Sequence, residues 1–265
     1  MSRKPTLSPT RIAAYLECAV RYRYIYIDRI GRFYMRSRPE LSFGSTLHQV
    51  LRAYHAAGAT QTAGEMLQQY ERHWVAAGYE SAAQEEQFRE AGVGIVRSYH
   101  AASAERAAAG VETLLTEKTI RADLGRFALI GRVDRVDRHP DGTLEVVDYK
   151  SGRMSVTPEE VAGDLALRIY QLILRRTRPD SRVIATLYCL RSGGQASAGM
   201  ADEEAERFAA DIAALGDQIL DRDFDTVEPV PVTGCARCEF LPRCERSWRR
   251  SGLPARPTRE EAPDN

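Results

Sequence analysis

Lysine is scarce in this chain, which has 37 basic residues but only three lysines, Lys4, Lys118 and Lys150. Arginine does not easily replace lysine where a compact ammonium group must touch a small reacting group. A lysine that falls within a cluster of carboxylates is therefore of interest in so arginine-rich a sequence. With three lysines in the chain, such a placement supports a reactive site without establishing one.

Several other absences narrow the class of protein. No apolar run approaches the roughly 20 residues that span a bilayer, and the N-terminus MSRKPTLSP lacks the apolar core of a signal peptide. We therefore expect a cytoplasmic protein. No G-x-x-x-x-G-K-[ST] phosphate loop occurs, which argues against a nucleotide-driven motor. The five cysteines are an odd number, which disfavours a disulfide framework.

The composition is that of a soluble globular protein, with 43% apolar and 28% charged residues among 265. This length can bury one large domain, or one domain with an appendage. The net charge is zero, but basic residues gather at both ends: nine within residues 1–38 and seven within residues 234–259, against two acidic residues in each segment. Such segregation favours nucleic-acid binding over a merely solvated surface.

Hydrophobic periodicity predicts the secondary structure. We expect helices over residues 7–27 (including Cys18), 43–57 (capped near Gly44-Ser45), 60–109 (two helices meeting near Gly78), 157–177 and 200–222. Strands are expected over 114–123, 126–138, 143–150 and 183–190. This order predicts an α+β fold rather than a doubly wound sheet. Residues 226–233 are predicted to be an extended linker, and those from about 251 to be disordered.

One hairpin carries the side chains with the clearest chemical potential. The turn HPDG at 139–142 contains an Asp-Gly pair, a strong hairpin signal. Asp148 and Lys150 share one face of the second strand because side chains alternate along a strand. A loop of two to four residues would place residue 147, 148 or 149 opposite Asp134. We therefore expect Asp134, Asp148 and Lys150 to lie together.

Two carboxylates facing each other across a hairpin form a hard oxygen site for Mg²⁺ or Mn²⁺. A neighbouring lysine can orient an attacking water and stabilise charge that grows on a phosphoryl group. Beside a basic surface, this combination favours phosphodiester hydrolysis. The alternative is a surface Asp–Lys pair on an edge strand, which is common and contributes little.

The C-terminal cysteines form a C-x2-C-x5-C cluster, CARCEFLPRC. Three clustered cysteines require a fourth ligand, and Cys18 is the candidate because Cys189 falls in a strand predicted to be buried. Four thiolates suit tetrahedral zinc or an iron–sulfur cluster, and the spacing leaves both open. Either centre would join the two basic ends of the chain.

An aromatic run near the N-terminus also has two interpretations. Tyr22, Tyr24 and Tyr26 alternate with Arg21 and Arg23. Such a run can stack on bases or hold a phosphate. Alternatively, the tyrosines pack in the core.

Taken together, these motifs resemble one known family. GRVDRVD and VVDYKSG resemble the PD-(D/E)XK nuclease superfamily in its RecB-like branch. LSPTRIAAYLEC resembles that branch's N-terminal helix with the first cluster cysteine, and FGSTLH resembles its G-x-x-x-H motif. CARCEFLPRC resembles its C-terminal iron–sulfur cysteines. The motifs cover most of the chain in the family's order, so the joint match is specific.

The resemblance implies a role for each matching residue. Asp134, Asp148 and the backbone carbonyl of Tyr149 would bind Mg²⁺ or Mn²⁺ together with His48, and Lys150 would be the catalytic lysine.

Two further positions belong to this implied site, and the cysteines gain a role as well. Glu117 matches a supporting acidic position. Tyr170 matches the tyrosine of the family's Q-x-x-x-Y motif, but Ala166 stands in place of its glutamine, which puts the contacts of this helix with DNA in doubt. The resemblance also favours a [4Fe–4S] cluster over structural Zn²⁺, with Cys18, Cys235, Cys238 and Cys244 as its ligands.

The fold implied is a restriction-endonuclease-like core, in which helices flank a mixed sheet with an antiparallel meander. We predict a single domain over residues 1–250. It would contain a helical part at about 45–110, a nuclease core at about 111–225 and a cluster segment at 234–250 joined to Cys18. Residues 251–265 would form a disordered tail.

The activity implied is that of a divalent-metal-dependent DNA nuclease, most simply an exonuclease that acts on single strands or duplex ends in DNA repair or recombination. A CRISPR-associated adaptation nuclease of the same superfamily would share these motifs. The alternative that is not an enzyme is a non-catalytic iron–sulfur DNA-binding subunit of a helicase–nuclease complex. The expected partner is DNA, and a helicase or CRISPR adaptation proteins are possible protein partners. Binding to a membrane is not expected.

Overall fold

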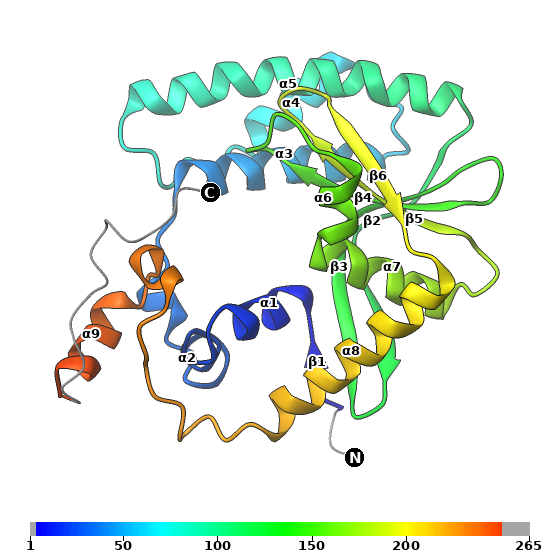
Figure 1. The fold of residues 1–265 in the computed structure, drawn as a ribbon. Helices are drawn as coiled ribbons and strands as arrows, with labels where there is room; N and C mark the ends of the chain where they lie inside the picture. Colours follow the sequence, from blue (N-terminus) through cyan, green and yellow to red (C-terminus); the bar gives the residue numbers. More distant parts are fainter. Residues whose placement is uncertain (1–3, 251–265) are drawn as a thin grey trace. The chain divides into compact units, whose positions relative to one another are not determined.

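The computed structural model describes residues 4–250 (Figure 1). The chain forms two compact units. The first, here called the sheet unit, comprises Met1–Pro9 and Ser37–Ala214; the second, the cysteine unit, comprises Thr10–Arg36 and Leu215–Asn265. The single domain over residues 1–250 stays a prediction, and the predicted tail at 251–265 lies outside the described residues.

A six-stranded mixed sheet forms the centre of the sheet unit as described. The long strand β3 pairs in parallel with β1 and antiparallel with β2 and β4. Strand β4 then pairs in parallel with β5, which pairs antiparallel with β6. This arrangement confirms the predicted α+β fold and its antiparallel meander. The strands are β1 (Thr6–Leu7), β2 (Glu112–Leu124), β3 (Phe127–Arg138), β4 (Leu144–Lys150), β5 (Val183–Cys189) and β6 (Gln195–Gly199).

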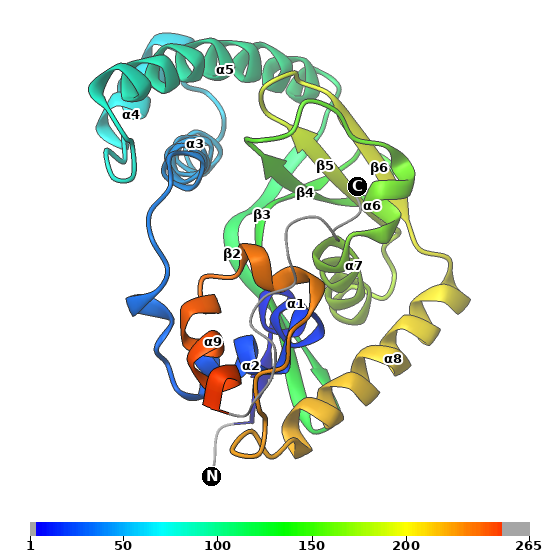
Figure 2. The same ribbon diagram turned by 60° about the vertical axis from the view of Figure 1, so that its left-hand side comes forward.

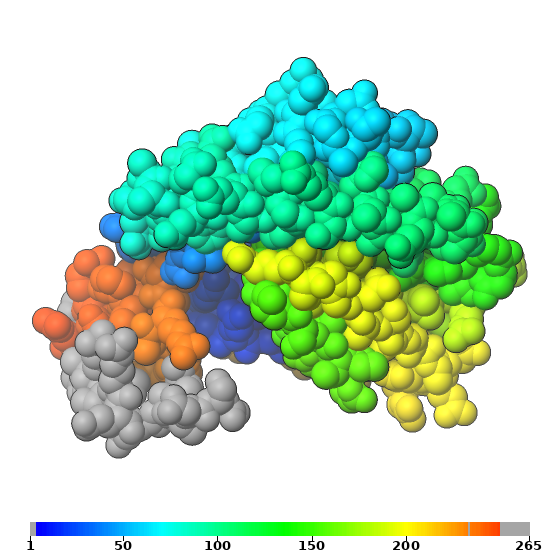
Figure 3. All heavy atoms as spheres, turned by 90° about the horizontal axis from the view of Figure 1, so that it is seen from above, coloured from blue at the N-terminus to red at the C-terminus, as the bar shows by residue number. Residues whose placement is uncertain are grey.

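Three helices cover one face of this sheet: α3 (Pro39–Ala56), α4 (Ala63–Arg72) and α5 (Ala82–Ala108). Their apolar side chains pack with Val147 and Tyr149 of β4 and Tyr188 of β5 in one buried cluster. The two helices predicted over 60–109 are therefore present, and Gly78, with a φ of +91° that glycine tolerates, lies between them. Figure 3 shows α5 exposed along the outer side of this layer.

The opposite face of the sheet is covered by α7 (Leu165–Thr177), which follows the short helix α6 (Pro158–Gly163), as Figures 1 and 2 show. The single helix predicted over 157–177 is wrong, because the backbone of Asp164 is extended. The Asp164 carboxylate instead accepts a hydrogen bond from the backbone N–H of Leu167 (3.0 Å) and begins a second helix. Helix α8 (Asp202–Asp221) follows β6 as predicted over 200–222.

The cysteine unit is built from short segments. Its helices are α1 (Pro9–Glu17), α2 (Ala19–Tyr22), the π-helix η1 (Arg23–Ile27), the 3₁₀ helices η2 (Gly31–Phe33) and η3 (Thr233–Arg237), and α9 (Leu241–Arg250). Cys18 was predicted to lie within a helix, but its backbone is extended (φ −168°, ψ 119°) and separates α1 from α2. Helix α9 was not predicted because its apolar residues are too few, although Trp248 is fully buried and donates a hydrogen bond to the carbonyl of Pro229 (2.9 Å).

The aromatic run of this unit packs in its core. Tyr22 stacks on Phe224 with ring centroids 5.0 Å apart, and the centroids of Tyr24 and Phe240 are 5.3 Å apart. Both tyrosines are buried. The interpretation of Tyr22 and Tyr24 as base-stacking residues is therefore wrong.

None of the described helices combines the length and the apolar character that a membrane crossing needs.

Candidate active site

The register of the β3–β4 hairpin brings the two predicted aspartates together. Arg135 pairs with Val147 and Val136 with Val146, so the residue before Arg135, Asp134, lies opposite Asp148. At this point the ladder gives way to a side chain, because the backbone N–H of Tyr149 donates to Oδ2 of Asp134 (2.8 Å). Asp134 and Asp148 therefore lie opposite each other, as the hairpin pattern predicted, and the strand pairing ends beside them.

A histidine from α3 completes a cluster with Asp134. Nδ1 of His48 lies 3.3 Å from Oδ1 of Asp134 and 3.4 Å from Oε1 of Glu117. The three side chains offer ligand atoms within 4.8 Å of one another. One nitrogen and two carboxylate oxygens at this spacing form a candidate site for a divalent cation.

The two carboxylates determine the protonation state of His48. Burial by itself would lower the pKa of His48, but the hydrogen bonds to Asp134 and Glu117 and the charges of both carboxylates raise the pKa to about 10. The imidazole is therefore protonated at neutral pH. A positive charge is thus favoured at this point of the fold.

The glycine of FGSTLH allows α3 to approach the end of β4. An added Cβ at Gly44 would lie 3.0 Å from Oγ of Ser151, the residue after Lys150. The helix begins at Pro39 rather than near Gly44-Ser45 as predicted, since proline is favoured at the first helical position. Gly44 therefore lies inside the helix, one turn before His48, and serves close packing rather than capping.

Glu117 has an unusual backbone. Its φ is +48° within β2, a left-handed conformation that costs a non-glycine residue on the order of 1–3 kcal/mol. The side chain is held by two partners, because Oε2 also accepts a hydrogen bond from Nε of Arg132 (2.7 Å). Strain retained at a residue that contacts His48 is typical of a functional position.

Asp148 and Lys150 form the second part of the site. Oδ2 of Asp148 is buried and lies 2.6 Å from Nζ of Lys150, so the two groups form a close ion pair. Burial and the charge of Asp134 raise the pKa of Asp148 to about 6, against the opposing effect of Lys150. Burial would lower the pKa of Lys150, but Asp148 more than compensates and raises it.

Helix α7 brings Tyr170 to the same region. An added Cβ at Gly131 of β3 would lie 2.5 Å from the Tyr170 ring, so only glycine allows the tyrosine to pack here. The pKa of Tyr170 is raised by burial and by the negative charges of Asp148 and Asp134. Ala166 lies one turn earlier on α7, where the family motif has glutamine, and the neighbouring Gln171 is buried and leaves its carbonyl oxygen without a partner among the described residues.

A cavity of about 490 Å³ opens beside the triad. His48, Glu117 and Asp134 line it together with further residues of α3, Arg132 of β3 and Ser151. Two of these, Arg52 and Arg132, are cationic and suited to phosphate groups. The cluster is therefore accessible to a substrate of appreciable size.

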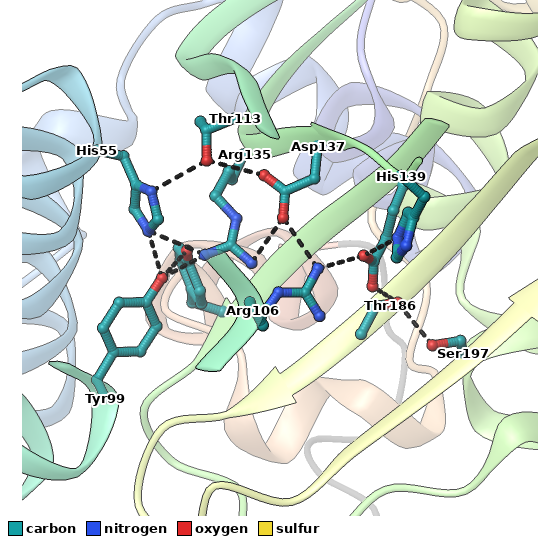
Figure 4. Close-up of polar contacts among 11 residues, drawn as sticks. His55, Tyr99, Arg106, Thr113, Arg135, Asp137, His139, Thr186 and Ser197 are labelled. Atoms are coloured by element: carbon teal, nitrogen blue, oxygen red, sulfur yellow. Dashed lines mark hydrogen bonds and ion pairs between the residues drawn. The ribbon is translucent and has the colours of Figure 1, made fainter. Parts of the chain in front are cut away.

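Behind the site lies a buried polar network that sequence patterns did not indicate (Figure 4). Arg135, which follows Asp134, is 2% exposed and donates to Tyr99 of α5 and to Nε2 of His55 of α3 (2.9 Å). Tyr99 and Tyr149 share a hydrogen bond between their hydroxyls (2.6 Å). The residue that donates its backbone N–H to Asp134 is thus tied through its side chain to α5.

The rest of the network balances its charges. Asp137 accepts a hydrogen bond from Thr113 (3.0 Å) and pairs with Arg135 and Arg106, each at 3.0 Å. Arg106 also pairs with the buried Glu145. Two guanidinium groups thus face two carboxylates, which is the condition for burying charge at tolerable cost.

The cysteine unit brings the four cysteines of the predicted cluster site to one cavity of about 490 Å³. Burial raises the pKa of the Cys244 thiol to about 11, and the other three cysteines add to this effect. Cys189 is fully buried in β5. The four thiols that share the cavity are Cys18, Cys235, Cys238 and Cys244.

Comparison with known proteins identifies the family. The family model of the PD-(D/E)XK nuclease superfamily matches residues 6–245. The chain belongs to the PD-(D/E)XK nuclease superfamily. This confirms the superfamily recognised in the motifs, whereas its RecB-like branch stays a prediction.

Two further similarities are more limited. A curated protein of Lactococcus lactis subsp. cremoris (strain SK11), named as a subunit of an ATP-dependent helicase/deoxyribonuclease, is 32% identical over 88 residues, which are 29% of this chain and 8% of that relative. The matched region thus spans a small part of the relative's length. A solved protein described as "Crystal structure of SSO0001" aligns over 93% of this chain and 89% of its own, with 12% identity and a TM-score of 0.37.

Proposed function

We propose that this PD-(D/E)XK protein is a divalent-metal-dependent DNA nuclease, an exonuclease directed at single strands or duplex ends in DNA repair or recombination. The observation that carries the proposal is the cluster of His48, Glu117 and Asp134 beside the Asp148–Lys150 pair. Family membership supports phosphodiester hydrolysis, and the Arg-rich segments of the chain support a polyanionic substrate.

The donor set fits Mg²⁺ or Mn²⁺. Hard cations take carboxylate and carbonyl oxygens, and here His48, Asp134, Asp148 and the backbone carbonyl of Tyr149 would hold the ion. The Asp148 carboxylate is buried and lies opposite Asp134 across the hairpin, which fits a ligand role. The ion would supply a polarised phosphoryl oxygen and a more acidic bound water. Its binding would release the proton of His48, because a ligand nitrogen must be neutral.

The protein's own groups would do the remaining work. Lys150, held beside Asp148, would place an ammonium where it orients the attacking water and stabilises charge on the phosphoryl group. Glu117 would keep His48 oriented, and Arg132 is positioned by its hydrogen bond to Glu117 at the cavity wall. Tyr170 would close the α7 side of the site, although Ala166 removes the amide that the family's motif provides.

The decisive test is Mn²⁺-dependent digestion of DNA labelled at the 3′ or the 5′ end, in single-stranded and duplex form. We expect the wild type to shorten at least one of these substrates. The cleavage rate of Lys150→Ala should be more than about 100-fold lower, because Lys150 would stabilise the transition state. Lys4→Ala is the matched control, because Lys4 forms an exposed ion pair with Asp123 (3.1 Å). Equal, undetectable activity of the wild type and Lys150→Ala on every substrate would refute the proposal.

We further propose that the cysteine cavity holds a [4Fe–4S] cluster. The four cysteines line one cavity of about 490 Å³. Four thiolates suit an iron–sulfur cluster or tetrahedral zinc, and the C-terminal cysteine motif resembles the iron–sulfur cysteines of the RecB-like branch. A brown, anaerobically purified protein with a broad visible absorbance that Cys238→Ser loses would support this proposal, and a colourless protein loaded with zinc would overturn it.

A second candidate function is that of the nuclease part of a helicase–nuclease complex. The favouring observation is the 88-residue similarity to a protein named as a helicase/deoxyribonuclease subunit. A CRISPR-associated adaptation nuclease shares the same motifs, and no observation favours it over the first candidate. Co-purification of a helicase with the tagged chain from its own cells would support the second candidate.

A further inference from the structure

The turn after the tyrosine run of the cysteine unit displays aromatic and basic side chains to solvent. It consists of residues 29–36, here called the basic turn, with η2 at its centre. Phe33 is 69% exposed, and the neighbouring Met35 is also exposed. The three arginines of the turn, Arg29, Arg32 and Arg36, are exposed as well.

The backbone of the basic turn is tightly held, so these side chains are presented on a fixed support. The N–H groups of Tyr34 and Met35 both donate to the carbonyl of Gly31 at 2.9 Å, and the N–H of Phe33 donates to that of Ile30 at 3.0 Å. Tyr34 points inward, with its ring centroid 5.0 Å from that of the buried Phe240. The turn is thus anchored by one aromatic residue while the adjacent one faces water.

The charge of the turn is not neutralised internally. Within the described residues, Arg29, Arg32 and Arg36 form no ion pair. Arg32 and Phe33 lie within the 3₁₀ helix η2, with Arg29 before it and Arg36 after it in the chain. The guanidinium of Arg32 lies over the Phe33 ring, 4.7 Å from its centroid. An exposed ring among uncompensated arginines is poorly suited to an apolar partner and well suited to a polyanion with flat aromatic groups.

We propose that the basic turn is a stacking site for single-stranded nucleic acid, with an unpaired base against Phe33 and the adjoining phosphates near Arg29, Arg32 and Arg36. Bases stack on phenylalanine rings and on guanidinium planes, and arginines follow the phosphate backbone. Inside a duplex the faces of the bases are covered by their neighbours, so an unpaired base offers a free face that an internal base pair lacks. This inference rests on the proposed nuclease function and specifies its substrate as an unpaired strand.

The test is binding without hydrolysis. Full-length protein is titrated into fluorescein-labelled oligo(dT) and, separately, into a duplex of equal length, in EDTA, with fluorescence anisotropy as the readout. We expect Phe33→Ala to raise the Kd for the single strand about tenfold, since one base–aromatic stack is lost, and Phe33→Trp to stay within about twofold of the wild type. Duplex binding should change little. Met154→Ala is the matched control, because Met154 is an exposed apolar residue of the sheet unit.

The arginines have a separate signature. Arg32→Ala should reduce the slope of log Kd against log salt concentration by about 0.7, the value for one phosphate contact on a single strand. An unchanged slope would remove Arg32 from the proposed contact.

Several results would overturn the stacking site. These are an equal Kd for the wild type and Phe33→Ala, an equal loss on single strand and duplex, or full binding by Phe33→Leu, which keeps apolar bulk without a ring. A wild-type dimer that Phe33→Ala dissolves in light scattering would assign Phe33 to a contact between copies instead. Because the assay contains EDTA, its outcome is independent of catalysis. Wild-type cleavage with unaltered binding by Phe33→Ala refutes the stacking site alone, whereas Phe33-dependent binding without any cleavage refutes the nuclease alone.

Discussion

His55 makes the stability of the sheet unit sensitive to acid. Its environment identifies the neutral tautomer. Arg135 donates to Nε2, so Nε2 is an acceptor. Thr113 donates its hydroxyl proton to Asp137, so Nδ1 of His55 must donate to the Thr113 oxygen, 3.1 Å away. Burial and the positive charges of Arg135 and Arg106 lower the pKa of His55 to about 3. A second proton would have to enter beside two guanidinium groups.

The sign and size of the effect follow from proton linkage. In the unfolded chain, histidine has a pKa of about 6.5. Below that pH the unfolded state binds a proton on His55 and the folded state does not, so the free energy of unfolding decreases as the pH falls. With a folded pKa of about 3, the loss grows from pH 6.5 down to about pH 3. Between pH 7 and pH 5 it amounts to about 2 kcal/mol, at about 1.4 kcal/mol for each unit below 6.5.

Urea unfolding at pH 7 and pH 5 measures this loss. Other groups also titrate, so the informative quantity is the difference between the wild type and His55→Gln. The variant is less stable at pH 7 because hydrogen bonds are disturbed, but it should lose about 2 kcal/mol less than the wild type on acidification. His73→Gln, at the C-cap of α4, is the matched control and should retain the wild-type loss. If His55→Gln and the wild type lose equal stability between the two pH values, the assignment of a buried neutral His55 is refuted.

Two further predictions concern packing and capping. Gly92→Ala should destabilise by about 1–3 kcal/mol in urea unfolding, because the added Cβ would lie 2.0 Å from the hydroxyl oxygen of the buried Tyr70. Gly94→Ala on the same helix meets open space and should stabilise by up to about 1 kcal/mol, so equal behaviour of the two variants would contradict this packing. Asp164→Ala should cost about 1 kcal/mol by removing the cap of α7, while Asp164→Asn retains most of it; a larger loss in the Asn variant would mean that charge, not capping, matters.

The hairpin was predictable because its information is local. Alternation along a strand puts Asp148 and Lys150 on one face, and an Asp-Gly turn limits the register to a few choices. The observed pairing of Arg135 with Val147 selects Asp148 as the partner of Asp134 from the three positions left open. The superfamily was also recognisable, since motifs in a fixed order carry more information than any one of them.

Helix ends and short elements were less predictable. Asp164 interrupts a continuous apolar stripe between α6 and α7, and Cys18 interrupts another between α1 and α2, in both cases by an extended backbone at a single residue. Periodicity averages over a window and does not detect such breaks. The two-residue strand β1 is too short to carry a pattern of its own and exists because β3 offers it a partner.

By itself, the sequence determined the fold class and the superfamily, because residue order sets strand faces, turn type and motif spacing. Only the tertiary structure decided which side chains are buried. It placed Tyr22 and Tyr24 in the core and left Phe33 in water, although all three are aromatic residues beside arginines. It also assembled His55, Tyr99 and Arg135 from three separate elements into one network behind Asp134. Burial and long-range contact depend on how distant segments pack, which no local pattern records.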